Sequence, residues 1–414
     1  MTDKSANIDD TAKLPMATWE FVTLMASLLA LNALAIDIML PGLGDIGESF
    51  ALHNANDQQA IIFAYILGFG VPQLFFGPLS DRFGRKALLQ IGLLGYIAMS
   101  VTCIFASSFS VFLVMRFSQG VFAACIRVIA GSIVRDLMSG REMARVMSTV
   151  MTVFMIAPIV APTIGVITMN FGPWQWIFLV LAIAAMIVLL WMTFRLPETL
   201  PTSQRRAINI GSILKAYWTV LTTRVTIGYM CASGVIYGSL FAFIGASEQI
   251  FTDVFDEGER FVIWFAVIAA SLAVANIINA RIVKRIGMRR ISHTVICVFI
   301  GLCVLNALLM AFVGEILWIF LPLFAITFGC FGMMGANFSA IAMEPQGEIS
   351  GTATAAYGFA TSTVASFFGI SVARQFDGTI APIMLGFVVL GVLCLVIVYI
   401  TEKGRLFEVG AGHK

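Results

Sequence analysis

The chain has 414 residues, of which 59% are hydrophobic and 12% are charged, and its formal net charge is +2. A soluble domain carries roughly 25% charged residues, so this composition excludes a soluble globular protein and predicts a protein embedded in a lipid bilayer. The small positive net charge gives no reason to expect a nucleic-acid partner.

Twelve apolar segments follow one another along the chain, and each is long enough to cross roughly 30 Å of hydrocarbon as a helix. Their approximate bounds are 19–47, 57–79, 87–107, 110–134, 146–169, 173–194, 223–247, 261–281, 290–312, 316–342, 352–373 and 379–401. The first segment is too long for the apolar core of a cleaved signal peptide, and no Ala-x-Ala site follows it. The sequence therefore predicts an all-α membrane protein with 12 transmembrane helices.

The basic residues are distributed unevenly between the two membrane faces. With both termini placed in the cytoplasm, 21 of the 25 Lys and Arg fall in the tails and loops of the cytoplasmic face, and only Arg260 and Arg374 fall on the other face. Cytoplasmic loops collect positive charge, so this distribution predicts cytoplasmic termini. Arg116 and Arg127 are left inside a predicted helix.

A charged turn at 77–86 reads Gly-Pro-Leu-Ser-Asp-Arg-Phe-Gly-Arg-Lys, and its charges are too costly for lipid, so it must lie at a membrane face. A weak echo occurs at 280–289, where Gly287 follows Gly84 by 203 residues. The longest cytoplasmic connection separates six segments from six. We therefore expect two related halves, and the expected divisions are a tail at 1–18, a first half at 19–194, a linker at 195–222, a second half at 223–401 and a tail at 402–414.

Two opposite charges are expected at similar depth in the first half. Asp37 lies 18 residues after Trp19, about 27 Å along a helix, and Arg116 lies 19 residues before Arg135, about 28 Å. An ionisable group at such depth is a functional hypothesis by default, and a buried carboxylate is tolerated when an arginine pairs with it. We interpret the pair as a proton-coupling device. The alternatives are that the helix ends at Pro41 with Asp37 as an interfacial cap, or that a permanent ion pair joins the two helices.

Several motifs together resemble the major facilitator superfamily of membrane transporters, its drug:proton antiporters and, within them, the bicyclomycin-resistance branch. The motifs lie at 36–41, 77–86, 116–120, 133–136, 157–165, 174–178, 342–345 and 351–353. The resemblance implies a bacterial inner-membrane exporter that exchanges an amphipathic small molecule for protons by alternating access between two pseudo-symmetric six-helix halves. It implies a role in proton coupling for Arg116. It also implies a cytoplasmic gate, made of Gly77, Asp81, Arg82, Gly84 and Arg85.

Segment 146–169 contains two prolines four residues apart, Pro158 and Pro162, followed by Gly165. The prolines are expected to kink this helix, and the small residues to allow close packing against a neighbour. The related antiporters usually carry a richer glycine-proline run here, and at 131, where the branch often has an arginine, this chain has glycine. Arg127 lies one turn deeper instead.

A central cavity between the halves is the expected substrate site. Its candidate lining residues are Asn32, Tyr65, Arg127, Tyr237, Phe241, Phe328, Phe331 and Asn337. Arg127 would attract an anionic group, pair with a carboxylate or extend to the surface. The alternative function is therefore a transporter of the same fold for one specific metabolite, a siderophore, sugar or amino acid derivative, with Arg127 as the anion ligand.

Enzymatic chemistry, metals and organic cofactors are not expected. The seven cysteines are scattered singly and only three histidines are present, so no metal-ligand spacing is found. The turn at 77–86 lacks the Lys-Ser/Thr ending of a nucleotide-binding loop. We expect a monomer whose partners are the bilayer, protons and an amphipathic small-molecule substrate.

Overall fold

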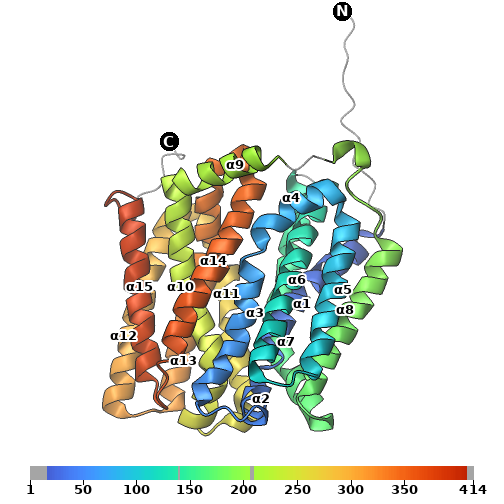
Figure 1. Ribbon diagram of the computed structural model, residues 1–414. Helices are drawn as coiled ribbons and strands as arrows, with labels where there is room; N and C mark the ends of the chain where they lie inside the picture. The colour runs from blue at the N-terminus through green and yellow to red at the C-terminus, as the bar shows by residue number, and fades with distance from the viewer. Residues whose placement is uncertain (1–15, 139, 206–208, 408–414) are drawn as a thin grey trace, which may run out of the picture.

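The computed structural model describes residues 16–138, 140–205 and 209–407, and in this part of the chain every long element is an α-helix. The long helices run side by side between two ends of a bundle, and the short helix α2 (Leu43–Ser49) lies at one end (Figure 1). Helix α9 (Ile210–Thr222) crosses the opposite end. That end also carries the charged turn at 77–86, and the distribution of basic residues predicts that it is the cytoplasmic face, the name used for it below.

The helices of the first half gather on one side of the bundle and those of the second half on the other (Figure 1). The first half contains α1 (Thr18–Asp37), α2, α3 (Ala60–Gly70), α4 (Gln73–Phe83), α5 (Arg85–Ile104), α6 (Phe109–Leu137), α7 (Gly140–Phe171) and α8 (Gln175–Arg195). The second half contains α10 (Arg224–Gln249), α11 (Phe261–Ile286), α12 (Met288–Val313), α13 (Leu317–Met343), α14 (Ser350–Ala373) and α15 (Ala381–Thr401).

The prediction of twelve membrane spans is confirmed when one bent pair is counted as a single span. Eleven described helices are long and apolar enough to cross a membrane alone, and the residues from Ala55 to Phe83 form the twelfth with a bend of 44°. Pro72 lies at the bend between α3 and α4. Because proline has no backbone N–H to donate, it interrupts the helix there.

The first span is also interrupted. Helix α1 ends at Asp37, and a 3₁₀ turn at Leu40–Gly42, with Pro41 inside it, leads into α2. The sequence predicted one segment over 19–47 and placed a helix end at Pro41 only as an alternative. The break matters for function because it frees backbone carbonyls at the end of α1.

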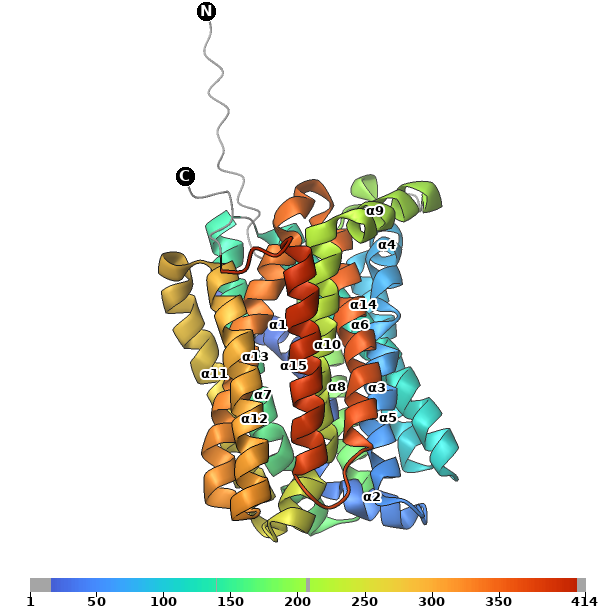
Figure 2. The same cartoon turned by 90° about the vertical axis from the view of Figure 1, so that its left-hand side faces the viewer.

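The segment at 195–222 was expected to be a cytoplasmic linker, and it contains a helix. Helix α9 lies across the cytoplasmic ends of its neighbours (Figure 2), and the Tyr217 hydroxyl donates to the Leu74 carbonyl at 2.7 Å. Ile210, Leu214 and Trp218 are exposed along one side at helical spacing, a pattern typical of a helix at a membrane surface. The flanking polar residues concealed this periodicity.

The two halves turn corners of the same shape at equivalent positions. Gly84, between α4 and α5, has φ +96°, and Gly287, between α11 and α12, has φ +92°. Glycine adopts this conformation without the steric cost that other residues meet. The weak echo between 77–86 and 280–289 thus marks matching helix corners in the two halves.

Candidate functional site

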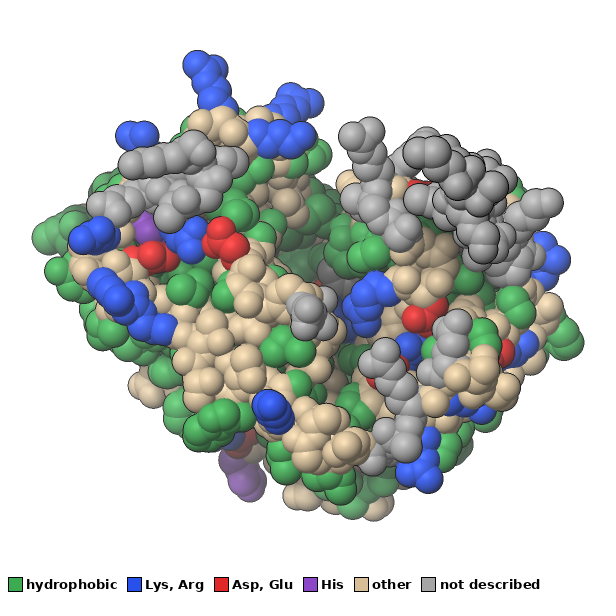
Figure 3. Space-filling view, turned by 90° about the horizontal axis from the view of Figure 1, so that it is seen from above, with side chains coloured by type: hydrophobic (Ala, Val, Ile, Leu, Met, Phe, Trp, Pro, Cys, Tyr) green, Lys and Arg blue, Asp and Glu red, His purple; other side chains and the backbone are tan. Residues whose placement is uncertain are grey.

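A hollow opens between two masses of side chains on the cytoplasmic face (Figure 3). Arg127, about two turns inward from Arg135 on α6, has an exposed side chain. Its guanidinium lies over the Phe69 ring of α3, 5.6 Å from the centroid, and it interacts electrostatically with Tyr237 of α10. Arg127 therefore lies between the two halves rather than on the outer, lipid-facing surface.

The structure corrects half of the predicted cavity lining. Arg127 is exposed, and Tyr237, Phe241 and Asn32 are half-buried, as a lining residue requires. Four other candidates are buried in this conformation and present almost no surface to a solute: Tyr65, Phe328, Phe331 and Asn337.

Packing within each half explains this burial. The Phe331 ring lies 5.4 Å from that of Phe299 and 5.5 Å from that of Phe328, so these side chains form the interior of the second half. Asn337 exchanges two hydrogen bonds with Asn279 of α11, at 3.1 and 3.0 Å. Depth along a helix, which the sequence provides, does not say toward which neighbour a side chain points.

Asp37 is the last residue of α1 and is only 4% exposed, which excludes the alternative of a solvated interfacial cap. It forms no ion pair with any described residue. A carboxylate at the C-terminal end of a helix meets the negative end of the helix dipole. Burying a carboxylate without an ion-pair partner costs free energy. Among the described acidic side chains of the first half, Asp37 is the one that bears this cost.

Arg116 is fully buried on α6, but it forms no ion pair or hydrogen bond with Asp37. The expectation of a direct ion pair is wrong for this conformation. Its guanidinium donates instead to the Gln119 side chain and, at 3.0 Å, to the Ala35 carbonyl. Because α1 ends at Asp37, carbonyls of its last turn lack helical partners and are available to the arginine. The charge thus binds α1 two residues before the carboxylate.

Aromatic and polar side chains complete the surroundings of Arg116. The Tyr65 ring centroid lies 4.6 Å and the Phe178 centroid 5.7 Å from the guanidinium carbon, distances of cation–π contact. Tyr65 donates from its hydroxyl to Asn32 at 3.0 Å, and Gln119 donates to Ser100 at 2.7 Å. Sequence reasoning missed Ser100, although a lone serine in an apolar segment is a signal.

Close backbone contact holds α7 against the segment that follows Asp37. A Cβ atom on Gly165 would lie 2.0 Å from the carbonyl oxygen of Ile38, so only glycine fits there. Pro158 and Pro162 lie inside α7, which continues through both. The small residue of this motif, more than the prolines, places α7 beside the end of α1.

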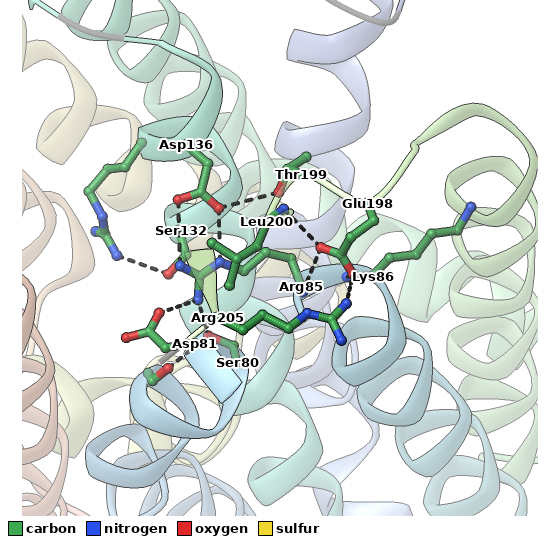
Figure 4. Close-up of polar contacts among 12 residues, drawn as sticks. Ser80, Asp81, Arg85, Lys86, Ser132, Asp136, Glu198, Thr199, Leu200 and Arg205 are labelled. Carbon is green, nitrogen blue, oxygen red and sulfur yellow. Dashed lines mark hydrogen bonds and ion pairs between the residues drawn. The ribbon is translucent and has the colours of Figure 1, made fainter. Parts of the chain in front are cut away.

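The cytoplasmic turn forms a cluster centred on Arg85 (Figure 4). Arg85 pairs with Asp81 at 2.6 Å and with Asp136, at the end of α6, at 2.9 Å. Glu198, after α8, accepts from the backbone N–H groups of Arg85 at 2.9 Å and Lys86 at 3.3 Å. The cluster therefore joins α4, α5, α6 and the chain after α8, all within the first half.

The remaining residues of the predicted gate lie at the margin of this cluster. Arg82 is exposed with its guanidinium over the Phe83 ring, at 5.4 Å, and forms no ion pair with a described residue. Gly77 accepts a hydrogen bond from Ser80 through its carbonyl, at 2.8 Å. Neither residue forms a hydrogen bond or ion pair with a described residue of the second half.

A matching cluster occupies the equivalent corner of the second half. Arg289, at the start of α12, pairs with Glu344 at 2.9 Å and with Glu402 at 3.0 Å, at the ends of α13 and α15. Glu344 thus binds an arginine of its own half, because the corner at Gly287 brings α12 to the end of α13.

The two halves are joined by side-chain contacts at the outer end. Gln249 of α10 accepts from Gln59 at 2.7 Å and donates to Asn56 at 3.0 Å, and Glu248 accepts from Gln58 at 3.2 Å. Glu248 is half-buried in this network. Among the described residues, the one ion pair between the halves also lies here, between Arg374 and Asp57 at 3.8 Å.

These contacts define the conformation. The outer end is fastened by amide hydrogen bonds, and the opposite face is hollowed (Figure 3). The described residues contain no group of three or more His, Cys, Asp or Glu side chains arranged to hold a metal ion. The arrangement is that of a transporter with an opening at the cytoplasmic face.

A model of the Major Facilitator Superfamily matches residues 25–370, and the chain therefore belongs to this superfamily of membrane transporters. A bicyclomycin resistance protein homolog of Haemophilus influenzae is 27% identical over 373 residues, 89% of this chain and 92% of that protein. The uncharacterized MFS-type transporter YdgK of Bacillus subtilis is 30% identical, covering 81% and 84% of the two chains.

The multidrug resistance protein MdtL of Escherichia coli O157:H7 is 31% identical over 263 residues, 62% of this chain and 64% of that protein. Among solved structures, a D-xylose-proton symporter has a TM-score of 0.71 at 13% identity, covering 94% of this chain and 99% of that one. The human organic anion transporter MFSD10 has a TM-score of 0.61 at 16% identity, covering 93% and 100%. At these identities the structures support the fold alone.

Proposed function

We propose that the protein is an efflux transporter that exchanges an amphipathic small molecule for protons. The observation that carries this proposal is Asp37, a buried carboxyl group without an ion-pair partner among the described residues. Two residues before it, the carbonyl of Ala35 accepts a hydrogen bond from the buried guanidinium of Arg116. The names of the bicyclomycin-resistance and MdtL relatives support drug efflux as the direction and the substrate type.

The geometry supports a cycle with two gates. In the present conformation a substrate enters the hollow from the cytoplasm while the amide network around Gln249 keeps the outer end closed. Rocking of the halves then opens the outer end. Protonation of Asp37 from outside and release of that proton inside would couple the proton gradient to this movement. In one conformation the positive charge of Arg116 binds the end of α1 close to Asp37, which favours loss of the proton there.

We further propose that the protein lies in the bacterial inner membrane with both termini in the cytoplasm, works as a monomer and needs no cofactor or enzymatic step. The bacterial relatives and the basic cytoplasmic loops support this orientation. The metabolite alternative has no separate structural support beyond Arg127.

The coupling proposal is tested first with Asp37→Asn. A resistance screen in cells stripped of their own exporters identifies a transported compound, and its accumulation is then measured in proteoliposomes with an imposed pH gradient. We expect Asp37→Asn to abolish gradient-driven accumulation, because an amide cannot carry the proton. Asp45→Asn, an exposed site on α2, is the matched control and should transport normally. Unchanged accumulation with Asp37→Asn would overturn the assignment of Asp37 as the carrier.

A further inference from the structure

Arg127 is a cation between the two halves that forms no ion pair with any described residue. Its side chain is exposed, and its guanidinium lies over the Phe69 ring of α3. The other interior arginine, Arg116, is buried and bound by a glutamine and a backbone carbonyl. The two arginines of α6 therefore differ: one is held by the protein, and the other is free to bind a solute.

The surroundings of Arg127 are aromatic. Phe69 of α3 lies beneath the guanidinium, and Tyr237 of α10, in the second half, is near enough to interact with it electrostatically. A Cβ atom on Gly335 would lie 2.0 Å from the Tyr237 hydroxyl oxygen. The Tyr237 side chain therefore packs directly against α13, which fixes the position of its ring. Its ring lies 6.2 Å from that of Phe331. The Phe69 ring of the first half and the Tyr237 ring of the second half thus lie near the guanidinium of Arg127, which has no ion-pair partner among the described residues.

Closure of the cytoplasmic face would change the energy of this cation. While the hollow is open, water solvates the guanidinium. When the halves close over it, much of that water leaves, and a charge without a counter-charge becomes costly. An anionic group that enters with the substrate removes this cost, because charge-assisted hydrogen bonds to a guanidinium are stronger than neutral ones. A neutral substrate leaves the cost in place.

We propose that Arg127 binds the substrate directly and that this transporter prefers aromatic or apolar small molecules that carry a carboxylate. This inference rests on the proposed efflux function and adds the substrate class. The carboxylate binds the guanidinium of Arg127, and the apolar body of the substrate lies against the half-buried ring of Tyr237. Because the binding residues come from both halves, a bound substrate contacts both halves at once.

Binding of a matched probe pair tests the proposal on the purified full chain. The probes are 1-naphthoate and 1-naphthamide, which share two rings and differ in charge, and binding is measured by isothermal titration calorimetry in lipid nanodiscs. We expect the wild-type protein to bind naphthoate roughly tenfold more tightly than naphthamide, the lower end of the range for hydrogen bonds to a charged group. Equal binding of the two probes, or no binding of either, contradicts the proposal.

Variants then assign the preference to Arg127. Arg127→Gln should lose the preference for naphthoate and keep its affinity for naphthamide, which also shows that the site is folded. Arg127→Lys should recover part of the preference, since it restores the charge without the planar fork. Arg260→Gln removes a cation from the outer surface and should behave as wild type. A naphthoate preference that survives in Arg127→Gln would overturn the assignment.

The same variants separate this inference from the proposed function. In cells stripped of their own exporters, Arg127→Gln should lose resistance to carboxylate-bearing compounds and keep resistance to neutral ones. If the wild type gives equal resistance to anionic and neutral compounds, the proposed substrate class is refuted. If Asp37→Asn also loses resistance to all of them, proton-coupled efflux is still supported. Absence of any gradient-driven transport by the wild type would refute both.

Discussion

At the scale of single residues, the interior of the first half depends on how a buried cation is satisfied. Arg116 has no exposed surface, and its partners are Gln119, the Ala35 carbonyl and two aromatic rings. These groups carry no charge, so the protein holds the arginine without neutralising it. Under the proposed coupling, Asp37, which is buried in the same half and forms no ion pair with a described residue, is free to change its partners during the cycle.

Removal of Gln119 should weaken this arrangement. In Gln119→Leu, Arg116 loses one acceptor and Ser100 loses its donor, and an unsatisfied hydrogen bond of a buried charged group costs roughly 1.5–3 kcal/mol. We expect a clear fall in the melting temperature of the purified protein, followed by intrinsic tryptophan fluorescence. Gln375→Leu, at an exposed outer-loop site, is the control. A melting temperature equal to that of the control would show that Gln119 does not support the arginine.

At the scale of elements, helix positions are set by glycine contacts and by helix ends. Gly120 of α6 lies against the Tyr65 carbonyl of α3, where a Cβ atom would be 2.1 Å from the oxygen, and Gly165 of α7 lies against Ile38. Both contacts surround the end of α1. The helices that carry Arg116 and those that border Asp37 are therefore held at backbone contact distance, which leaves little tolerance for added atoms.

Gly165→Ala should separate α7 from the end of α1. The added methyl group would overlap the Ile38 carbonyl, and overpacking of this kind costs about 1–3 kcal/mol. We expect lower thermal stability together with reduced gradient-driven transport. Gly301→Ala, on α12 with open space around its Cβ position, should leave both unchanged. Normal transport by Gly165→Ala would mean that α7 can move away from Ile38 without effect on the site.

At the scale of the whole molecule, the conformation depends on a difference between the two ends. The amide network of Asn56, Gln59 and Gln249 joins the halves at the outer end. At the cytoplasmic end, the clusters of Arg85 and Arg289 each stay within one half among the described residues. The outer network therefore favours the conformation that opens to the cytoplasm, and the cytoplasmic clusters keep each half rigid as it rocks.

Gln249→Leu should shift the population toward the outward-open conformation. It removes two hydrogen bonds between the halves, each with a net value of about 1 kcal/mol, which together correspond to a population shift of roughly tenfold or more. Spin labels at Asn54 and Asp377, exposed in outer loops of the two halves, would report it as a longer distance in pulsed electron resonance, in a chain with exposed Cys297 replaced by Ser. Gln375→Leu should leave the distance distribution unchanged, and the same result for Gln249→Leu would exclude this network as a gate.

Composition, hydropathy and the placement of basic residues were sufficient to predict the membrane class, the twelve spans and the matching corners at Gly84 and Gly287. These features are local or additive, since each span must be apolar along its own length and each tight corner needs its own glycine. Sequence also pointed to Asp37 and Arg116, because ionisable residues inside apolar segments are conspicuous without any knowledge of their neighbours.

Only the tertiary structure decided what those residues touch. It bound Arg116 to Ala35 rather than Asp37, buried Phe331 and Asn337 inside the second half, left Arg127 exposed over Phe69 and joined Gln59 to Gln249 across the outer end. Each of these facts depends on the rotation of a helix about its axis and on which helix lies beside it. Those quantities are set by packing between segments far apart in the chain, so the pattern within any one segment does not contain them.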